Sequence, residues 1–267
     1  NNLGSSIYTP YFYVISENRD LTIKPRLFDK NKLVLQNEFR QKNKNSITVA
    51  DFSITTGHDS YPGDKGNTRS HFFTNTIMDL SLSNYTSSLL EINYEKTSND
   101  NYLKLFNLDS PLLLESNDLL ESIIKLDLEH EDYDLTTSFK MYETLSGSSS
   151  DRYQYVFPSY SLTKNFNYDN LDGSFNFNSS GNNTLRDTNV STSIVSNDLN
   201  YTTYDSFFNN GVKTNFEVSL KNINTVGKNS TQYKDTLQSE LMSSYVYNAS
   251  IPLIKSTPKN INTFEPK

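Results

Sequence analysis

The sequence lacks several residue types on which common protein functions depend. It has no cysteine and no tryptophan, and it has three histidines among 267 residues. The absence of cysteine excludes disulfide bonds and thiolate metal sites. His58, His71 and His130 are too scattered to have the spacing of metal ligands, so we expect no metal and no cofactor. No Gly-rich phosphate loop and no Ser-His-Asp signature is found, and we expect no enzyme.

Clustered charge and long apolar runs are also missing. The 24 basic and 31 acidic residues give a net charge of −7, and no basic patch occurs. This argues against nucleic acid as a partner. No segment approaches the roughly 18 apolar residues of a transmembrane helix. The opening residues NNLGSSIYTP contain neither a basic nor an apolar segment, so we expect no signal peptide in them.

Hydrophobic residues are scarce, at 34% of the chain, and the mean hydropathy is −0.63. A soluble protein of this length would have difficulty filling a core with so few. A transmembrane β-barrel needs only every second strand residue to be apolar, because its lumen side can be polar. The aromatic content of 13% argues against disorder. The composition is therefore compatible with a membrane barrel.

Alternation of apolar and polar residues predicts strands along the whole chain. In residues 211–222, for example, Phe216 and Leu220 alternate with Glu217 and Ser219. Several such segments run for about ten residues, which is long enough to cross a bilayer at a tilt. A soluble β-sandwich also alternates, so single strands do not decide between the two. We predict an all-β fold, an antiparallel up-and-down transmembrane β-barrel segment of about a dozen strands, forming one domain over residues 1–267.

Connections between the predicted strands are of two kinds. Short polar turns are expected at residues 16–19, 42–45 and 84–87. Longer connections are expected at residues 57–69, 98–120, 146–152, 180–187 and 225–234. The longer ones follow the even-numbered strands, so we expect them at one end of the sheet, as in membrane barrels.

The first predicted hairpin, YTPYFYVISENRDLTIKPRLF, has a proline in each arm, Pro10 and Pro25. Proline cannot donate a ladder hydrogen bond, so strands normally admit it at an edge, a bulge or a first residue. From the sequence alone, an ordinary edge hairpin explains both prolines.

The motifs of this region resemble the start of the barrel domain of the LPS-assembly outer-membrane proteins, the LptD/OstA family. The resemblance begins with a Pro-Tyr-aromatic strand and continues with Asp-x-Thr-x-x-Pro-Arg and Glu-Phe-Arg. The corresponding residues are Pro10, Tyr11, Phe12, Asp20, Thr22, Pro25, Arg26, Glu38, Phe39 and Arg40. Later matches, in family order, are NTRSHFF with Arg69 and His71, and the Asp100–Tyr102 region of SNDNYL.

This resemblance implies an outer-membrane protein of a Gram-negative bacterium that inserts lipopolysaccharide into the outer leaflet. The implied partners are lipopolysaccharide, a plug lipoprotein of the LptE kind, and periplasmic LPS-bridge proteins. The first and last strands of such a barrel meet at a seam. By resemblance, Pro10, Tyr11, Phe12 and Pro25 would form the lateral gate there. The alternative is a general outer-membrane porin or receptor barrel.

The chain also departs from the family pattern. The periplasmic jellyroll, the C-terminal barrel strands and the family's cysteines are absent. We therefore expect an N-terminal part of the barrel domain.

One further segment, DLEHEDYDL, gathers five carboxylates around His130. It could hold a hard cation such as Ca²⁺, but a charged hairpin turn explains it better.

Overall fold

The computed structural model describes residues 3–29, 32–58, 67–113, 118–146, 149–166, 172–256 and 261–264. Most of these residues form strands. The first half contains β1 (Ser6–Tyr8), β2 (Tyr11–Ser16), β3 (Arg19–Phe28), β4 (Lys32–Lys42), β5 (Ser46–His58), β6 (Asn67–Asp79), β7 (Ser87–Thr97), helix α1 (Tyr102–Phe106) and β8 (Leu119–Glu129). The second half contains β9 (Tyr133–Thr144), a 3-10 turn (Ser149–Asp151), β10 (Tyr153–Phe166), β11 (Gly173–Arg186), β12 (Ser191–Thr203), β13 (Ser206–Phe207), β14 (Lys213–Lys228), β15 (Gln238–Ser250), β16 (Leu253–Ser256) and β17 (Ile261–Phe264).

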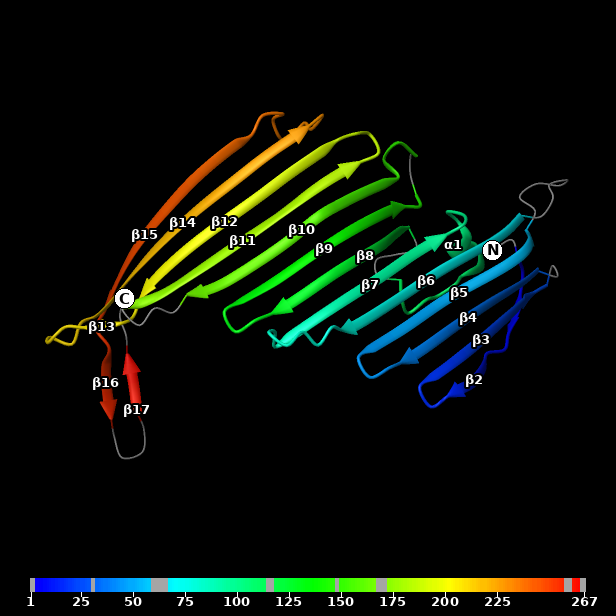
Figure 1. Ribbon diagram of the computed structural model, residues 1–267, viewed down its shortest axis with the longest axis horizontal. Coiled ribbons are helices and arrows are strands. Elements are labelled where there is room, and N and C mark those ends of the chain that lie inside the picture. The colour runs from blue at the N-terminus through cyan, green and yellow to red at the C-terminus, as the bar shows by residue number, and fades with distance from the viewer. Residues whose placement is uncertain are drawn as a thin grey trace.

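The strands form one 15-stranded antiparallel sheet, and β16 and β17 form a separate hairpin (Figure 1). From β3 to β12 each strand pairs with the next one along the chain; β1 and β2 both pair with β3, and β12 pairs with β14. Within the described residues the sheet is open, with β1 and β2 along one edge and β15 along the other. The prediction of an all-β, up-and-down antiparallel fold is confirmed. Such an open meander is compatible with part of a barrel wall. Among the described residues, no helix is both long and apolar enough to span a bilayer.

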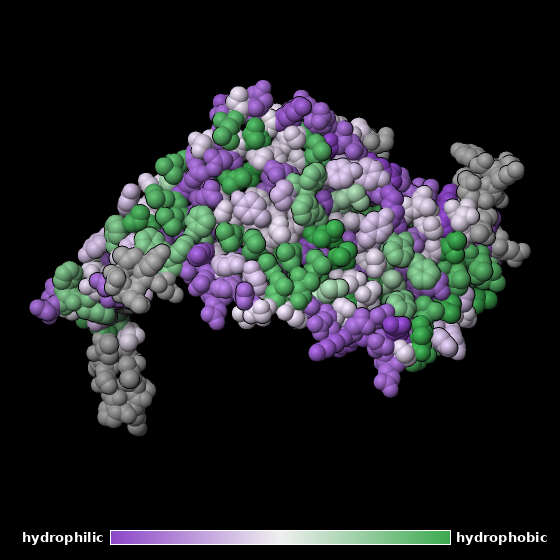
Figure 2. All heavy atoms as spheres, viewed as in Figure 1, coloured by the Kyte–Doolittle hydropathy of each residue, from purple (hydrophilic) through white to green (hydrophobic). Residues whose placement is uncertain are grey.

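The two faces of the sheet differ in polarity, as the alternation predicts. One face, here called the polar face, carries Lys24, Gln36 and Asp51. Lys24 lies opposite Gln36 in the β3–β4 ladder, and the Gln36 side chain donates to Asp51. The opposite, apolar face carries exposed hydrophobic side chains such as Phe52 and Phe72. Figure 2 shows hydrophobic residues gathered over β3–β5 and across the middle of β8–β10. One sheet therefore presents a polar and an apolar surface.

The connections also separate into two groups. Counted with β1 and β2 as one interrupted strand, the short turns follow the odd-numbered strands; they come after β2, β4, β6 and β8 and lie at one end of the sheet. Helix α1 belongs to the 21-residue connection of residues 98–118 at the other end. The expectation that residues 180–187 form a long connection is wrong, since Ser180 to Arg186 lie inside β11. There Ser180 pairs with Ser161 and with Ser196. Backbone pairing on both sides keeps this polar segment extended.

The hydrophobic core of the described residues is small and lies on the polar face. It forms where α1 packs, and its most buried members include Phe28, Val34, Phe73, Leu103 and Phe106, each at most 2% exposed. Phe28 and Phe106 meet edge to face, with ring centroids 5.7 Å apart. Helical periodicity does not predict α1, because five residues are too few to show it. The β7–β8 connection therefore supplies the apolar material that the polar face of β3–β6 lacks.

The ladder between β7 and β8 ends before the strands do. Pairing stops at Asn93 opposite Ile123, although β7 continues to Thr97 and β8 begins at Leu119. Side chains bridge the two diverging strands: the Asn93 side-chain amide donates to the backbone carbonyl oxygen of Glu121 at 2.8 Å. The Glu121 amide donates to Glu95 Oε2 at 2.9 Å. At this place side-chain bonds replace the backbone ladder.

Because α1 supplies much of this core, we expect the loss of one of its buried side chains to lower the stability of the fold. Replacing Phe106 with Ala removes a fully buried ring and should lower the free energy of unfolding by about 3–5 kcal/mol. Phe208→Ala, at a ring that is 57% exposed, serves as the control and should cost far less. Denaturant titration of both variants measures the difference, and equal costs would show that α1 contributes no core.

Candidate functional site

The first strand of the sheet is interrupted at Thr9 and Pro10. β1 and β2 both pair with β3, with Tyr8 opposite Arg26 and Tyr11 opposite Ile23. This unchanged register places Thr9 opposite Pro25 and Pro10 opposite Lys24. The two prolines therefore lie at adjacent pair positions of one hairpin. β2, beyond the break, is exposed at all six residues.

The two prolines remove hydrogen-bond donors on different sides of this strand. The Thr9 amide donates to the Pro25 carbonyl oxygen at 3.3 Å, so Thr9 and Pro25 occupy a hydrogen-bonded pair position. Pro25 has no N–H to donate back to Thr9, and the pair keeps one bond instead of two. In an antiparallel strand the next residue points its backbone groups the other way. Pro10 therefore lacks its donor on the free edge.

Ion pairs connect the polar face of this hairpin. Lys24 Nζ lies 2.7 Å from Glu38 Oε2, and Arg40 Nε lies 2.8 Å from Asp20 Oδ1. The Arg40 guanidinium also lies over the Phe12 ring, 5.9 Å from its centroid. The resemblance motif residues Asp20, Glu38 and Arg40 are thus brought together on one face.

The remaining motif residues of this region lie nearby without joining these pairs. Thr22 is opposite both Phe12 and Glu38. Tyr11 and Phe39 are on the apolar face, opposite Ile23 and Leu21. Arg69 lies opposite Thr55 in the β5–β6 ladder.

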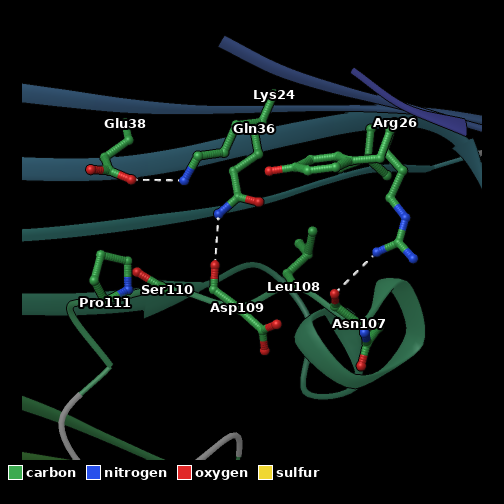
Figure 3. A pocket seen from close by; sticks show the side chains of 11 residues that line it. Lys24, Arg26, Gln36, Glu38, Asn107, Leu108, Asp109, Ser110 and Pro111 are labelled. Carbon is green, nitrogen blue, oxygen red and sulfur yellow. Dashed lines mark hydrogen bonds and ion pairs between the residues drawn. The ribbon is translucent and has the colours of Figure 1, made fainter. Parts of the chain in front are cut away.

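A cavity of about 700 Å³ lies behind this edge, between β3, β4 and residues 107–111 of the β7–β8 connection (Figure 3). Arg26 closes one side by donating from Nη1 to the carbonyl oxygens of Phe106 and Asn107, at 3.0 and 3.2 Å. Gln36 Nε2 donates to the carbonyl oxygen of Asp109 at 3.0 Å. Charged and amide groups therefore line much of the cavity, and Tyr8 contributes a half-exposed ring at its rim.

A buried polar network fixes the helix end of this connection to the sheet. Ser53 Oγ lies 2.6 Å from His71 Nδ1 and 2.8 Å from the Tyr102 hydroxyl. His71 Nε2 lies 3.3 Å from Asp51 Oδ1, which also accepts a bond from Gln36 Nε2 at 3.0 Å. Burial raises the pKa of Tyr102 to about 12, so its hydroxyl stays protonated. The network joins β4, β5 and β6 to α1.

Asp51, His71 and Ser53 have the residue types of a nucleophile–base–acid relay, which the sequence pattern does not reveal. Their side chains, and that of Tyr102, are at most 3% exposed. The Ser53 hydroxyl faces the Tyr102 phenol instead of solvent. A nucleophile must reach its substrate, so this geometry supports a structural role: the network satisfies polar groups where α1 covers the sheet.

A second charged cluster lies where β7 and β8 diverge. Arg152 donates to both carboxylate oxygens of Asp100, at 2.7 and 3.0 Å, and to Glu143 Oε1 at 2.7 Å. Lys96 Nζ lies 2.7 Å from Glu143 Oε2. The hydrogen bonds from Arg152 hold the pKa of Asp100 below its ordinary value. Lys96 in β7 thus reaches β9 past the intervening strand.

Of this cluster, the family resemblance predicts Asp100 as a motif residue but does not predict Lys96, Glu143 or Arg152. Their contact depends on the strand register and on the end of the β7–β8 ladder, and neither is visible in the sequence.

The acidic segment around His130 forms a hairpin turn, as expected. β8 ends at Glu129 and β9 begins at Tyr133. The Asp132 amide donates to His130 Nδ1 at 3.1 Å, and the His130 ring stacks on Tyr133 at 4.8 Å. Within the described ranges, no group of three or more acidic or histidine side chains is placed to hold a metal ion. The side chain of His58 lies outside the described part.

Comparison with known proteins gives no match: neither a protein-family model nor a curated protein matches the chain.

The Asp100–Arg152 pair predicts a pH-dependent contribution to stability. The pKa of Asp100 is lower in the folded chain than in the unfolded chain, where it is about 3.9. The pair therefore stabilises the fold above that pH, and the contribution is lost as the pH falls through the folded-state pKa. Because the Asp100 side chain is 42% exposed, Asp100→Asn should cost at most about 1 kcal/mol at pH 7.

Denaturant titrations at several pH values measure this effect. The difference between wild type and Asp100→Asn should narrow below about pH 4. Glu131→Gln, at an exposed position of the β8–β9 turn, is the control. A cost for Asp100→Asn that does not change with pH would contradict the ion-pair explanation.

Proposed function

We propose that this chain forms part of the wall of an outer-membrane β-barrel that inserts lipopolysaccharide into the outer leaflet. The sugar part would pass along the polar face of the sheet. The acyl chains would leave sideways through a lateral gate, the seam between the β1/β2 edge and the strand that pairs with it. This work is conduction and needs no covalent step, so the proposed protein is a transporter and not an enzyme.

The two faces of the sheet support a membrane setting. Strands of 10–16 residues, such as β3 and β14, are long enough to cross a bilayer at a tilt. They keep exposed hydrophobic side chains on the apolar face and ion pairs such as Lys24–Glu38 on the polar face. Lipid on one side and water on the other would satisfy both surfaces.

The position of the prolines carries the proposal of a gate. Pro25 leaves one hydrogen bond where two would form between the first strands, and Pro10 lacks its donor toward the free edge. Each missing bond withholds about 0.5–1.5 kcal/mol from the ladder. The missing Pro10 donor lowers the cost of parting the seam, and the missing Pro25 bond loosens the edge strand on β3. Lateral exit of an amphipathic lipid requires the seam to part.

The resemblance to the LptD/OstA family supplies the proposed partners. These are lipopolysaccharide, a plug lipoprotein in the lumen and the periplasmic LPS-bridge proteins. A general porin or receptor barrel is the alternative. It explains the two faces equally well but gives the two edge prolines no role.

Restoring the missing donors tests the gate. In the intact protein, Pro10→Val together with Pro25→Val should lower the amount of lipopolysaccharide at the cell surface, because one added bond then holds the seam and a second holds the edge strand on β3. Immunoblotting of surface-exposed lipopolysaccharide, at matched protein levels in the outer membrane, measures the effect.

The single variants separate the two donors. Pro25→Val adds a bond to Thr9 inside this chain, whereas Pro10→Val acts only through the partner strand at the seam. Pro252→Val, between β15 and β16, is the matched control and should leave export unchanged. Normal surface lipopolysaccharide in the double variant would contradict the gate.

A further inference from the structure

An apolar groove of about 350 Å³ lies on the apolar face where the β7–β8 ladder ends. Its lining includes Ile92, Tyr94, Ile124, Phe139, Met141 and Tyr155. The Ile124 and Phe139 side chains are 52% and 51% exposed. The groove is therefore an open depression in the wall, because two strands move apart beneath it.

The charged cluster lies at one end of this groove. Three polar residues lie two positions from a groove residue on the same strand. Lys96 follows Tyr94, Glu143 follows Met141, and Tyr153 precedes Tyr155. Side chains two apart share a face of a sheet, so a row of polar groups directly borders the apolar lining. The Tyr153 hydroxyl accepts a hydrogen bond from Lys96 Nζ at 3.1 Å.

Arg152, which donates to Glu143, and Asp100, which pairs with Arg152, extend this row, so its exposed charges are of both signs. The side chains of Lys96 and Arg152 are 40% and 29% exposed, and that of Asp100 is 42% exposed. The Glu143 side chain is 1% exposed and is occupied by Lys96 and Arg152. A ligand that reaches this site therefore meets two cationic groups and one partly exposed carboxylate, and Arg152 and Asp100 already pair with each other.

We propose that this site binds one phosphatidylethanolamine molecule, with an acyl chain in the groove and its headgroup on the charged row. The phosphate would accept hydrogen bonds from Lys96 and Arg152, and the ammonium group would approach Asp100. A headgroup with one phosphate and one primary ammonium complements this charge pattern. Phosphatidylglycerol offers the phosphate but no partner for Asp100.

The inference rests on the membrane setting of the proposed function. Inside a bilayer, apolar surface alone gives little selectivity, because every lipid tail satisfies it equally. Retention of one lipid must therefore come from the shape of the groove and from the headgroup contacts. The shape of the groove can be changed without changing the headgroup contacts, because Ile124 lines the groove and is not part of the charged row.

The test uses the intact protein in nanodiscs that contain equal amounts of phosphatidylethanolamine and phosphatidylglycerol with identical acyl chains. After release into detergent, native mass spectrometry counts the phospholipids retained per protein. The wild type should retain one phosphatidylethanolamine, preferred about fivefold or more over phosphatidylglycerol. No preference in the wild type would overturn the proposal.

Matched variants separate the two halves of the site. Ile124→Trp fills the groove and should reduce retention about fivefold or more. Ile54→Trp, at a 46% exposed isoleucine of the same face, should retain lipid as the wild type does. Equal retention in both variants would overturn the proposal. Asp100→Asn should keep a bound lipid but lose the headgroup preference, and a preserved preference would exclude Asp100 from the site.

The same experiment distinguishes the two proposals. Failure of the protein to enter nanodiscs would contradict the membrane setting and the lipid site together. Insertion without retained lipid would overturn the lipid site alone and leave the gate to be judged by lipopolysaccharide export.

Discussion

The structure depends on one constraint: a single sheet must satisfy two different surroundings with side chains that alternate along its strands, apart from bulges such as the one between Val156 and Ser159 in β10. In the β5–β6 ladder, Asp51 and Phe73 point to one face while Phe52 and Phe72 point to the other. Shifting any strand by one residue would exchange these sets. The register of the paired strands is therefore what separates a polar surface from an apolar one, and the sites described above depend on it.

A sheet with one polar face has little core of its own, and the β7–β8 connection supplies one. Phe106 and Leu103 bring apolar side chains onto the polar face, and the Asp51–His71–Ser53–Tyr102 network satisfies the polar groups that they cover. The connection thereby braces β3 to β6. The sheet loses ladder hydrogen bonds where this connection leaves it, because β7 and β8 diverge there. The Lys96–Glu143–Arg152 cluster bridges that divergence.

The alternation of the sequence predicts the fold class, the faces and the short turns, because a period of two is a local property. It fails at residues 180–187, where polar residues occupy both faces and only pairing with β10 and β12 keeps the chain extended. It also fails at α1, whose short helix is stabilised by packing and not by propensity. The family resemblance names His71 and Asp100. It does not name Asp51 or Arg152, because the buried network and the charged cluster depend on register between distant strands.

The same register explains why the prolines matter more in the structure than in the sequence. On one side of Thr9, the chain is anchored: Leu3 is buried in the core, the Ser5 amide donates to Asp29 and Arg26 donates to the Ser6 hydroxyl. On the other side, β2 is exposed along its whole length and pairs with β3 alone among the described strands. The pair with one missing bond lies between these two halves. Separation of β2 from β3 would therefore break fewer contacts than separation of β1 from β3, because on the β1 side of Thr9 the core and the side-chain bonds would have to be broken as well.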